Sequence, residues 1–286
     1  MTQRRGFTLI EVLVALVIMG VVTGAIYRLL NTSQRLSLAQ AEQVSLQSNV
    51  RTGSLVVPNE LRELNTVLGA GVGPRNDIIV AEPDAITYRA MRGLGFLCQA
   101  AGAGDTELRL ARSNWTGLRA PDATRDDLYL FTDGDPYDDD DDTWTQVDVT
   151  VVTPSANACG AGAAGYELTV AAIPEDMPLN TPVRLFELMR LELYADDGEW
   201  WLGAQSVSAG EIEPQPMLGP LTDDGFGLEY LDSNGNPTAD KTAIKSIRLT
   251  VRGVTDVAVR AGGSGAMGHP EEELVTQVLL RNSIRP

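Results

Sequence analysis

The sequence predicts an α+β protein in which one long N-terminal helix precedes a head built from an antiparallel β-sheet. Three observations lead to this prediction. An apolar run fills residues 7–27, no proline occurs before Pro58, and from Asp77 onward short segments with strand-like patterns alternate with turn residues. The chain therefore divides near residue 58 into a helical part and a strand-rich part.

The composition is that of a folded protein and excludes several classes of function. The 286 residues are 43% hydrophobic and 21% charged, enough apolar material for one large or two small domains. A formal charge of −17 repels nucleic-acid phosphates, so the body of the protein is not expected to bind nucleic acid. One histidine and two cysteines leave little material for histidine-based catalysis, zinc clusters or iron–sulfur sites. The composition favours a protein that is not an enzyme.

Residues 7–27 contain a single charge, Glu11. As a helix this run would be about 31 Å long, which is enough to cross the hydrocarbon core of a bilayer once. The apolar core of a secretory signal peptide is shorter, about 7–15 residues, so a retained membrane span is favoured over a cleaved signal. Basic residues flank the run on both sides, with Arg4 and Arg5 before it, so the charge pattern only weakly puts the N-terminus on the cytoplasmic side.

Glu11 is the residue in this span that needs a partner. A carboxylate in a membrane helix costs about 2.5–3.5 kcal/mol on insertion scales. One solution is that the side chain reaches water near the lipid headgroups. Another arises if the chain is cut between Gly6 and Phe7, because the new α-ammonium group would lie four residues before Glu11, on the same helix or on a neighbouring one. In that case Glu11 would set the register in which helices pack side by side.

These residues resemble the prepilin signal of the type IV pilin superfamily. That signal has a short basic leader that ends in glycine, then Phe-Thr-Leu-Ile-Glu and a long apolar helix. Here residues 1–6 end in Gly6 and residues 7–11 read Phe-Thr-Leu-Ile-Glu, with no departure. The resemblance implies a pilin-like fold, and cleavage after Gly6 by a prepilin peptidase that also methylates the amine of Phe7. It also implies that Glu11 pairs with the Phe7 amine of an adjacent subunit during assembly.

The chain stays compatible with a helix beyond the apolar run. Residues 28–57 carry an imperfect apolar stripe, which predicts a periplasmic half of the helix that packs one face on the head. Gly20 and Gly24 have the G-x-x-x-G spacing that lets backbones approach closely, although small residues are common in membrane helices in any case. The helix-bending proline of many pilins is missing from this sequence. Pro58 is expected to begin a short second helix over residues 59–68.

Candidate strands follow in the head, residues 58–286. They cover residues 84–92, 106–111, 127–131, 143–153, 165–173, 183–194, 226–230, 244–252 and 273–280. The clearest alternation of apolar and polar residues, over 247–252, predicts a strand with one face on a core and the other in water. Residues 195–198 are expected to form the turn of a hairpin. The head is therefore predicted to be an antiparallel sheet laid against the helix.

A second resemblance extends over the head. The segments 191–202, 228–232, 247–251 and 278–282 resemble the serial strands of W-type minor pilins and J-type minor pseudopilins. This resemblance implies a low-abundance subunit that joins other minor pilins at the filament tip and primes assembly in the inner membrane. A J-type minor pseudopilin would act similarly in the short periplasmic filament of a type II secretion system. The long head with its acidic insertions favours the pilus.

Two acidic segments are candidates for binding calcium. Residues 133–142 hold seven carboxylates, among them Asp133, Asp135, Asp138 and Asp139, and such oxygen ligands suit calcium. The segment lacks the spacing and the closing glutamate of an EF-hand, so a hydrated acidic loop is favoured over a calcium site. Residues 232–236 have oxygen atoms at a spacing similar to that of calcium loops, but a hairpin turn is favoured there.

Cys98 and Cys159 are the only cysteines. In an oxidising periplasm a disulfide between them is expected, and closing a loop of about 60 residues would stabilise the fold by roughly 4 kcal/mol in the entropic view. Two separate buried thiols are the alternative. His269 is expected to be a loop residue rather than a general base. Ser54 lies outside any nucleophile-elbow context.

The favoured function is that of a minor pilin, a structural and initiating subunit of a type IV pilus. Its expected parts are a leader (1–6), a transmembrane half (7–27) and a periplasmic half (28–57) of the helix, and the head in the periplasm. Expected partners are other minor and major pilins or pseudopilins, the prepilin peptidase and the inner membrane, and calcium is the one cofactor considered. The alternatives are a J-type minor pseudopilin, a membrane-tethered calcium-dependent adhesin and a tethered periplasmic enzyme, the last of which lacks a visible catalytic cluster.

Overall fold

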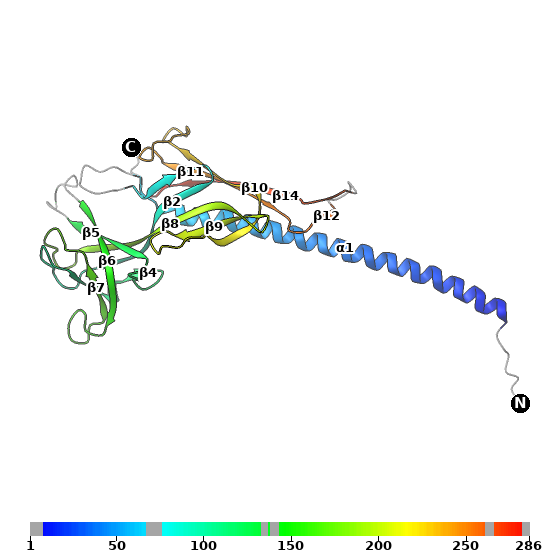
Figure 1. Ribbon diagram of the computed structural model, residues 1–286, viewed down its shortest axis with the longest axis horizontal. Helices are drawn as coiled ribbons and strands as arrows, with labels where there is room; N and C mark the ends of the chain where they lie inside the picture. Colours follow the sequence, from blue (N-terminus) through cyan, green and yellow to red (C-terminus); the bar gives the residue numbers. More distant parts are fainter. Residues whose placement is uncertain (1–7, 67–75, 133–136, 138–142, 261–265, 282–286) are drawn as a thin grey trace, which may run out of the picture. The chain divides into compact units, whose positions relative to one another are not determined.

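A computed structural model describes residues 8–66, 76–132, 137, 143–260 and 266–281. The chain divides into two compact units. The first, which we call the anchor unit, comprises Met1–Ser48 and Val254–Glu272, and the second, the sheet unit, comprises Asn49–Gly253 and Glu273–Pro286. Helix α1 (Leu9–Arg62), drawn in blue in Figure 1, begins in the anchor unit and ends in the sheet unit.

Helix α1 continues through Pro58 and ends at Arg62. The predicted end at residue 57 and the predicted second helix over 59–68 were therefore wrong. The helix crosses the proline because it buries an apolar row on both sides of it. The row is at most 1% exposed and consists of Val50, Val57 and Leu61. Burying three such side chains stabilises the fold by about 5 kcal/mol or more, which outweighs the roughly 3 kcal/mol that an interior proline costs.

A twelve-stranded sheet follows the helix (Figure 1). Its main path has the order β14-β11-β10-β9-β8-β5-β6-β7-β3, while β2 also pairs with β8, and β1 and β4 pair with β2. The bounds are β1 Ile78–Ala81, β2 Ala85–Phe96, β3 Glu107–Ala111, β4 Thr116–Gly117, β5 Asp126–Thr132, β6 Thr143–Ser155, β7 Gly165–Val170, β8 Pro182–Asp196, β9 Glu199–Ser206, β10 Gln215–Leu231, β11 Ser246–Val254 and β14 Glu271–Leu279. A short 3₁₀ helix (Arg112–Asn114) precedes β4, and the anchor unit adds a two-stranded sheet of β12 (Val259–Arg260) and β13 (Met267–Gly268).

Every strand predicted from the sequence is present, so the predicted α+β fold class is confirmed. The hairpin over 195–198 is also present. Asp196 pairs with Glu199, and the two turn residues Asp197 and Gly198 both have positive φ angles, 49° and 87°. The sequence did not predict the short strands β1, β4, β12 and β13. It also did not predict the first half of β10, which contains two prolines and therefore lacks the usual strand pattern.

The alternation over 247–252 is confirmed in β11. Ile247, Leu249 and Val251 are fully buried. Arg248 and Arg252, which alternate with them, form ion pairs with carboxylates of the neighbouring strands. The two faces of this strand are thus apolar and charged, as predicted.

Strand β8 is central to the sheet. It pairs with β2 along one edge, while its other edge pairs first with β5, over residues 183–187, and then with β9, over residues 189–196. Val183 and Leu185 belong to a buried core that also includes Leu128 and Leu130 of β5. Because side chains alternate along a strand, Arg184 and Phe186 lie on the opposite face of the sheet.

The end of α1 is tied to the sheet by hydrogen bonds. The backbone N–H of Arg281, just after β14, donates to the carbonyl oxygen of Arg62 at 2.8 Å. The hydroxyl of Thr66 donates to the carbonyl oxygen of Ile244 at 2.6 Å. These bonds join the last turn of the helix to the segment just after β14, and the chain after the helix to the segment just before β11.

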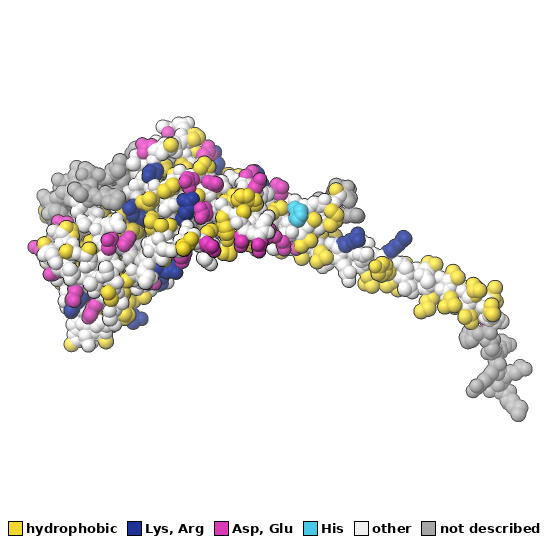
Figure 2. Space-filling model, viewed as in Figure 1, with side chains coloured by type: hydrophobic (Ala, Val, Ile, Leu, Met, Phe, Trp, Pro, Cys, Tyr) yellow, Lys and Arg dark blue, Asp and Glu magenta, His cyan; other side chains and the backbone are white. Residues whose placement is uncertain are grey.

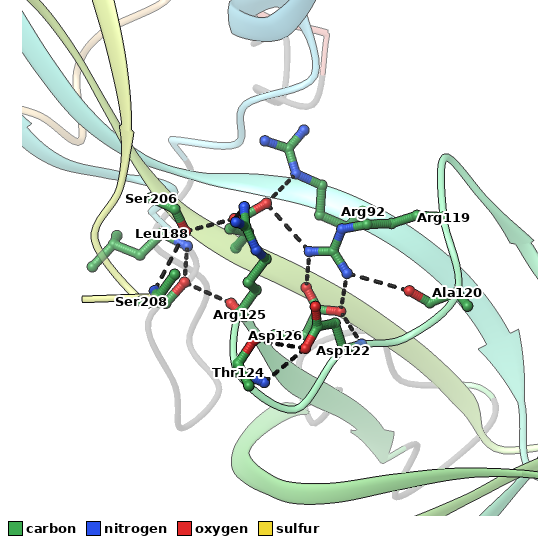
Figure 3. Close-up of polar contacts among 12 residues, drawn as sticks. Arg92, Arg119, Ala120, Asp122, Thr124, Arg125, Asp126, Leu188, Ser206 and Ser208 are labelled. Carbon is green, nitrogen blue, oxygen red and sulfur yellow. Dashed lines mark hydrogen bonds and ion pairs between the residues drawn. The ribbon is translucent and has the colours of Figure 1, made fainter. Parts of the chain in front are cut away.

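A buried carboxylate, that of Glu187, lies where the edge of β8 changes partner. Figure 3 labels the side chains that contact it, those of Arg92, Arg119, Arg125 and Ser206. The carboxylate accepts hydrogen bonds from the Ser206 hydroxyl at 2.6 Å and from Arg92 Nε at 2.9 Å, and Arg119 and Arg125 each lie 3.3 Å away. Burial alone would raise the pKa of Glu187, but these donors and positive charges outweigh it and hold the pKa below its ordinary value. The carboxylate therefore stays ionised inside the fold.

Asp126, the first residue of β5, extends this cluster. Its side chain is fully buried, and both of its oxygens accept hydrogen bonds from the Arg119 guanidinium at 2.6 Å. One oxygen also accepts the backbone N–H of Asp122 at 2.8 Å. Bidentate pairing of this kind is the strongest form of an arginine–carboxylate contact. The cluster thereby joins β5, β8, β9 and the loop before β5.

We expect Asp126→Ala to lower the free energy of unfolding by about 3 kcal/mol, because the substitution leaves Arg119 with one carboxylate instead of two. Urea unfolding of the full chain in detergent, followed by tryptophan fluorescence, measures this loss. The matched control is Asp223→Ala, which removes an exposed carboxylate from β10 and should change stability by less than about 0.5 kcal/mol. Equal losses of unfolding free energy in the two variants would show that the buried Arg119–Asp126 pair adds no more stability than an exposed carboxylate does.

Glu187→Gln should destabilise the protein in a pH-dependent way. Because the pKa of Glu187 is lowered in the fold, its stabilisation is present above the pKa of the unfolded chain, about 4.3, and is lost as the pH falls through the lower folded value. The variant should therefore be about 2–4 kcal/mol less stable than the parent at pH 7. At pH 3 the difference in unfolding free energy between parent and variant should be smaller. A difference of the same size at both pH values would contradict a lowered pKa for Glu187.

Candidate functional site

The candidate site is the start of α1. Gly6 and Phe7, the predicted processing residues, lie outside the described residues, so the site is described from Thr8 onward. The Thr8 hydroxyl accepts a hydrogen bond from the backbone N–H of Glu11 at 3.4 Å. The Glu11 carboxylate in turn accepts hydrogen bonds from the Thr8 backbone N–H at 3.0 Å and from the Thr8 hydroxyl at 3.1 Å. This reciprocal pair is a capping box, which provides partners for N–H groups that a helix start leaves unpaired.

The capping box fixes where the Glu11 carboxylate lies. It turns the carboxylate back toward the N-terminal end of the helix. Sequence reasoning missed this contact, although Thr-x-x-Glu ahead of an apolar run is the usual signal of a capping box.

The N-terminal part of α1 presents apolar side chains to its surroundings, as Figure 2 shows. Its large apolar residues from Leu9 to Tyr27 are between 49% and 83% exposed. Among the described residues, α1 is the one helix long and apolar enough to cross a membrane. An apolar surface of this extent is unfavourable in water, so lipid or other apolar helices must cover it. The helix therefore fits a membrane anchor.

Gly20 and Gly24 lie on this uncovered surface. A Cβ placed at either glycine would meet no atom within 4 Å. The two positions are one helical turn apart, so they form a shallow notch that a second helix backbone can approach.

Cys98 and Cys159 form a disulfide, with their Cα atoms 5.4 Å apart. The bond joins the segment after β2 to the connection between β6 and β7. Structural disulfides are formed and kept in oxidising compartments.

The predicted calcium ligands Asp133, Asp135, Asp138 and Asp139 lie outside the described residues, so calcium there stays a prediction. Within the described ranges, no group of three or more His, Cys, Asp or Glu residues could hold a metal ion. In the other acidic segment, Asp232 accepts hydrogen bonds from the backbone N–H groups of two asparagines, at 2.8 and 2.9 Å. These donors lower the pKa of Asp232 and use its carboxylate to close a turn.

His269 and Ser54 both form hydrogen bonds with the backbone. Nδ1 of His269 lies 2.7 Å from the carbonyl oxygen of Thr255, in the anchor unit. The Ser54 hydroxyl donates to the carbonyl oxygen of Arg51, one turn earlier in α1, at 2.8 Å. Both side chains thus hold local backbone in place.

Comparison with known proteins identifies the N-terminal segment. Residues 1–27 match the family described as the prokaryotic N-terminal methylation motif. No curated protein and no solved structure matches the chain. The matched residues include Gly6, Phe7 and Glu11 and the whole apolar run. With this motif, and with a long apolar helix followed by an antiparallel sheet, the chain has the prepilin-type signal and the pilin-like architecture of the type IV pilin superfamily.

Proposed function

We propose that this protein is a minor pilin, a structural and initiating subunit of a type IV pilus assembled from the inner membrane. The observation that carries the proposal is a carboxylate at the start of a helix whose apolar surface is uncovered in the described chain. Residues 7–27 would span the inner membrane, and the sheet unit would lie in the periplasm. The protein would have a structural role and no catalytic one.

Maturation would supply the counter-charge for Glu11. A prepilin peptidase would cut after Gly6 and methylate the new amine of Phe7. Before assembly, the two hydrogen bonds from Thr8 partly satisfy the carboxylate. In a filament, the amine of an adjacent subunit would be a stronger partner, because it brings a full positive charge into a low-dielectric environment.

Assembly would then proceed by lateral packing of apolar helices. Lipid tails are as apolar as the helix surface, so the gain in a membrane comes from close packing and polar pairing rather than from the hydrophobic effect. The notch at Gly20 and Gly24 allows close packing, and Glu11 allows polar pairing. Both features lie on the part of the helix that no other described residue covers.

Two other functions use the same anchor. A J-type minor pseudopilin would pack its helix in the same way in a type II secretion system, and the long acidic head is what favours the pilus. A calcium-dependent adhesin would need the acidic residues 133–142 to bind the ion. The phenotype of a deletion strain separates the first two, because a pilin is needed for piliation and a pseudopilin for secretion of exoproteins.

Mass spectrometry of the protein from its native membrane should find an N-terminus at Phe7 that carries one methyl group. The match over residues 1–27 predicts both the cut and the modification. Peptides from residues 8–27 should be retained, since the span is not expected to be removed. An intact leader, or a cut near Ala25, would overturn the proposal.

Glu11→Ala should leave membrane insertion intact and reduce assembly. Without the carboxylate, the Phe7 amine of the neighbour loses its counter-charge, and a loss of only about 1.4 kcal/mol per contact lowers association roughly tenfold. Cross-linking between subunits and counts of surface pili measure this effect in intact cells.

Glu42→Ala is the matched control, because it removes a carboxylate from the polar part of the same helix. That variant should assemble normally. Normal piliation and normal secretion in the Glu11→Ala strain would count against any role of Glu11 in packing helices.

A further inference from the structure

The sheet unit contains a cavity of about 570 Å³ on the face of the sheet opposite its core. The end of α1 and the chain just after it form one wall, and β2, β5, β6 and β8 form most of the rest. Asp77, just before β1, and Leu118, just after β4, complete the lining. The residues that carry the argument are Asp77, Arg89, Tyr129, Trp144, Arg184 and Phe186. A volume of this size is typical of sites for small molecules, which occupy roughly 300–1,000 Å³.

The register of the strands brings these side chains together. Tyr129 of β5 lies directly opposite Arg184 of β8. Phe186 is two residues further along β8, so it points to the same side as Arg184. Trp144 of β6 pairs with Phe131, which lies two residues after Tyr129 on β5. The side chains of Trp144 and Tyr129 therefore point to the same side of the sheet. The cavity wall is therefore a continuous surface across three strands.

Two of the three arginines that line the cavity, Arg89 and Arg184, lie over aromatic rings. The guanidinium carbon of Arg184 is 4.3 Å from the ring centre of Trp144. That of Arg89 is 5.6 Å from the ring centre of Phe186 and 5.9 Å from that of Tyr129, and these two rings stack on each other. Such contacts hold a guanidinium through its face and leave its N–H edge available to a planar oxyanion.

Three arginines, Arg89, Arg92 and Arg184, line the cavity together with three carboxylates, those of Glu60, Glu63 and Asp77. Neither Arg89 nor Arg184 forms an ion pair with a carboxylate of the described residues, whereas Arg92 in the same wall is paired with Glu60 and Glu187. Arg89 donates one hydrogen bond, to the carbonyl oxygen of Asn76 at 2.8 Å. Desolvation lowers the pKa of Arg184, although part of its side chain is exposed. Such a cation gains more from a counter-ion than one in open water does.

Asp77 is the one carboxylate that acts on both arginines through space. Burial raises the pKa of Asp77 to about 6, and this effect outweighs the hydrogen bond from the Asn65 backbone N–H and the two positive charges. Arg89 and Arg184 therefore both lie within electrostatic range of one poorly solvated carboxylate.

We propose that the cavity binds a small organic anion, with a carboxylate, phosphate or sulfonate group between Arg89 and Arg184 and a flat apolar body against the aromatic wall. Arg184 is exposed and can be reached from solvent, while Arg89 lies deeper. The site is independent of the proposed pilin function, because none of its residues belongs to the N-terminal helix half that would assemble a filament.

Benzenesulfonate is a suitable probe, since its charge is constant between pH 5 and pH 8, and benzenesulfonamide is a neutral molecule of nearly the same shape. In isothermal titration of the full chain in nonionic detergent, benzenesulfonate should bind with a dissociation constant of about 1 mM or tighter. The sulfonamide should bind at least tenfold more weakly. This comparison uses the unaltered protein, so it does not depend on the folding of a variant.

Arg184→Gln and Arg89→Gln should each weaken benzenesulfonate binding about tenfold or more. The matched control is Arg112→Gln, which removes an exposed arginine that has no ion pair among the described residues and should leave binding unchanged. Equal binding of the sulfonate and the sulfonamide, no binding of either, or an equal loss in the Arg112 variant would each overturn the proposal.

The pH dependence of binding tests the place of Asp77. The charged and titratable groups that line the cavity with it are Arg89 and Arg92 of β2, Arg184 of β8, Tyr129 of β5, and Glu60 and Glu63 at the end of α1. Below about pH 6 Asp77 is protonated and no longer repels the anion, so benzenesulfonate should bind roughly fivefold tighter at pH 5 than at pH 7.5. Asp77→Asn should remove this difference. A difference that persists in the variant would exclude Asp77 from the site.

Discussion

The sheet depends on one buried carboxylate. Glu187 lies where β8 exchanges β5 for β9 as its neighbour, a point at which an ordinary ladder would leave the strand ends unconnected. Its oxygens collect a hydroxyl from β9, a guanidinium from β2 and two more from the loop before β5. An apolar residue could fill this space, but it could not add side-chain bonds to the backbone ladders that already join β8 to β2, β5 and β9. Ion pairs and hydrogen bonds therefore stabilise the sheet at Glu187, whereas apolar packing stabilises the cores around it.

Two acidic residues, Glu11 and Glu187, differ in how far along the chain their partners lie. Glu11 takes its partners from Thr8, three residues away, whereas Glu187 takes its partners from residues between 19 and 95 positions distant. The first case was open to prediction because a capping box is local. The second was not, because the arginines that gather at Glu187 are ordinary surface residues until the strands pair.

The sequence did predict the order of elements, the hairpin between β8 and β9, and the two faces of β11, since each of these follows from a local pattern. It failed at Pro58, where a local rule lost to burial of Val50, Val57 and Leu61. It also failed for the first half of β10, whose prolines conceal a strand. The cavity near Arg184 could not be predicted at all, because it exists only through the register of β5, β6 and β8 and the position of the helix end. Local patterns in a single sequence do not predict which distant strands pair with each other or in which register.

The hydrogen bonds between the last turn of α1 and the strands around it bear on mechanics. The carbonyl oxygen of Arg62 holds the N–H of Arg281, and the hydroxyl of Thr66 holds the carbonyl of Ile244. A pull on the helix would therefore reach the chain at two places, just after β14 and just before β11, rather than only through the segment that follows the helix.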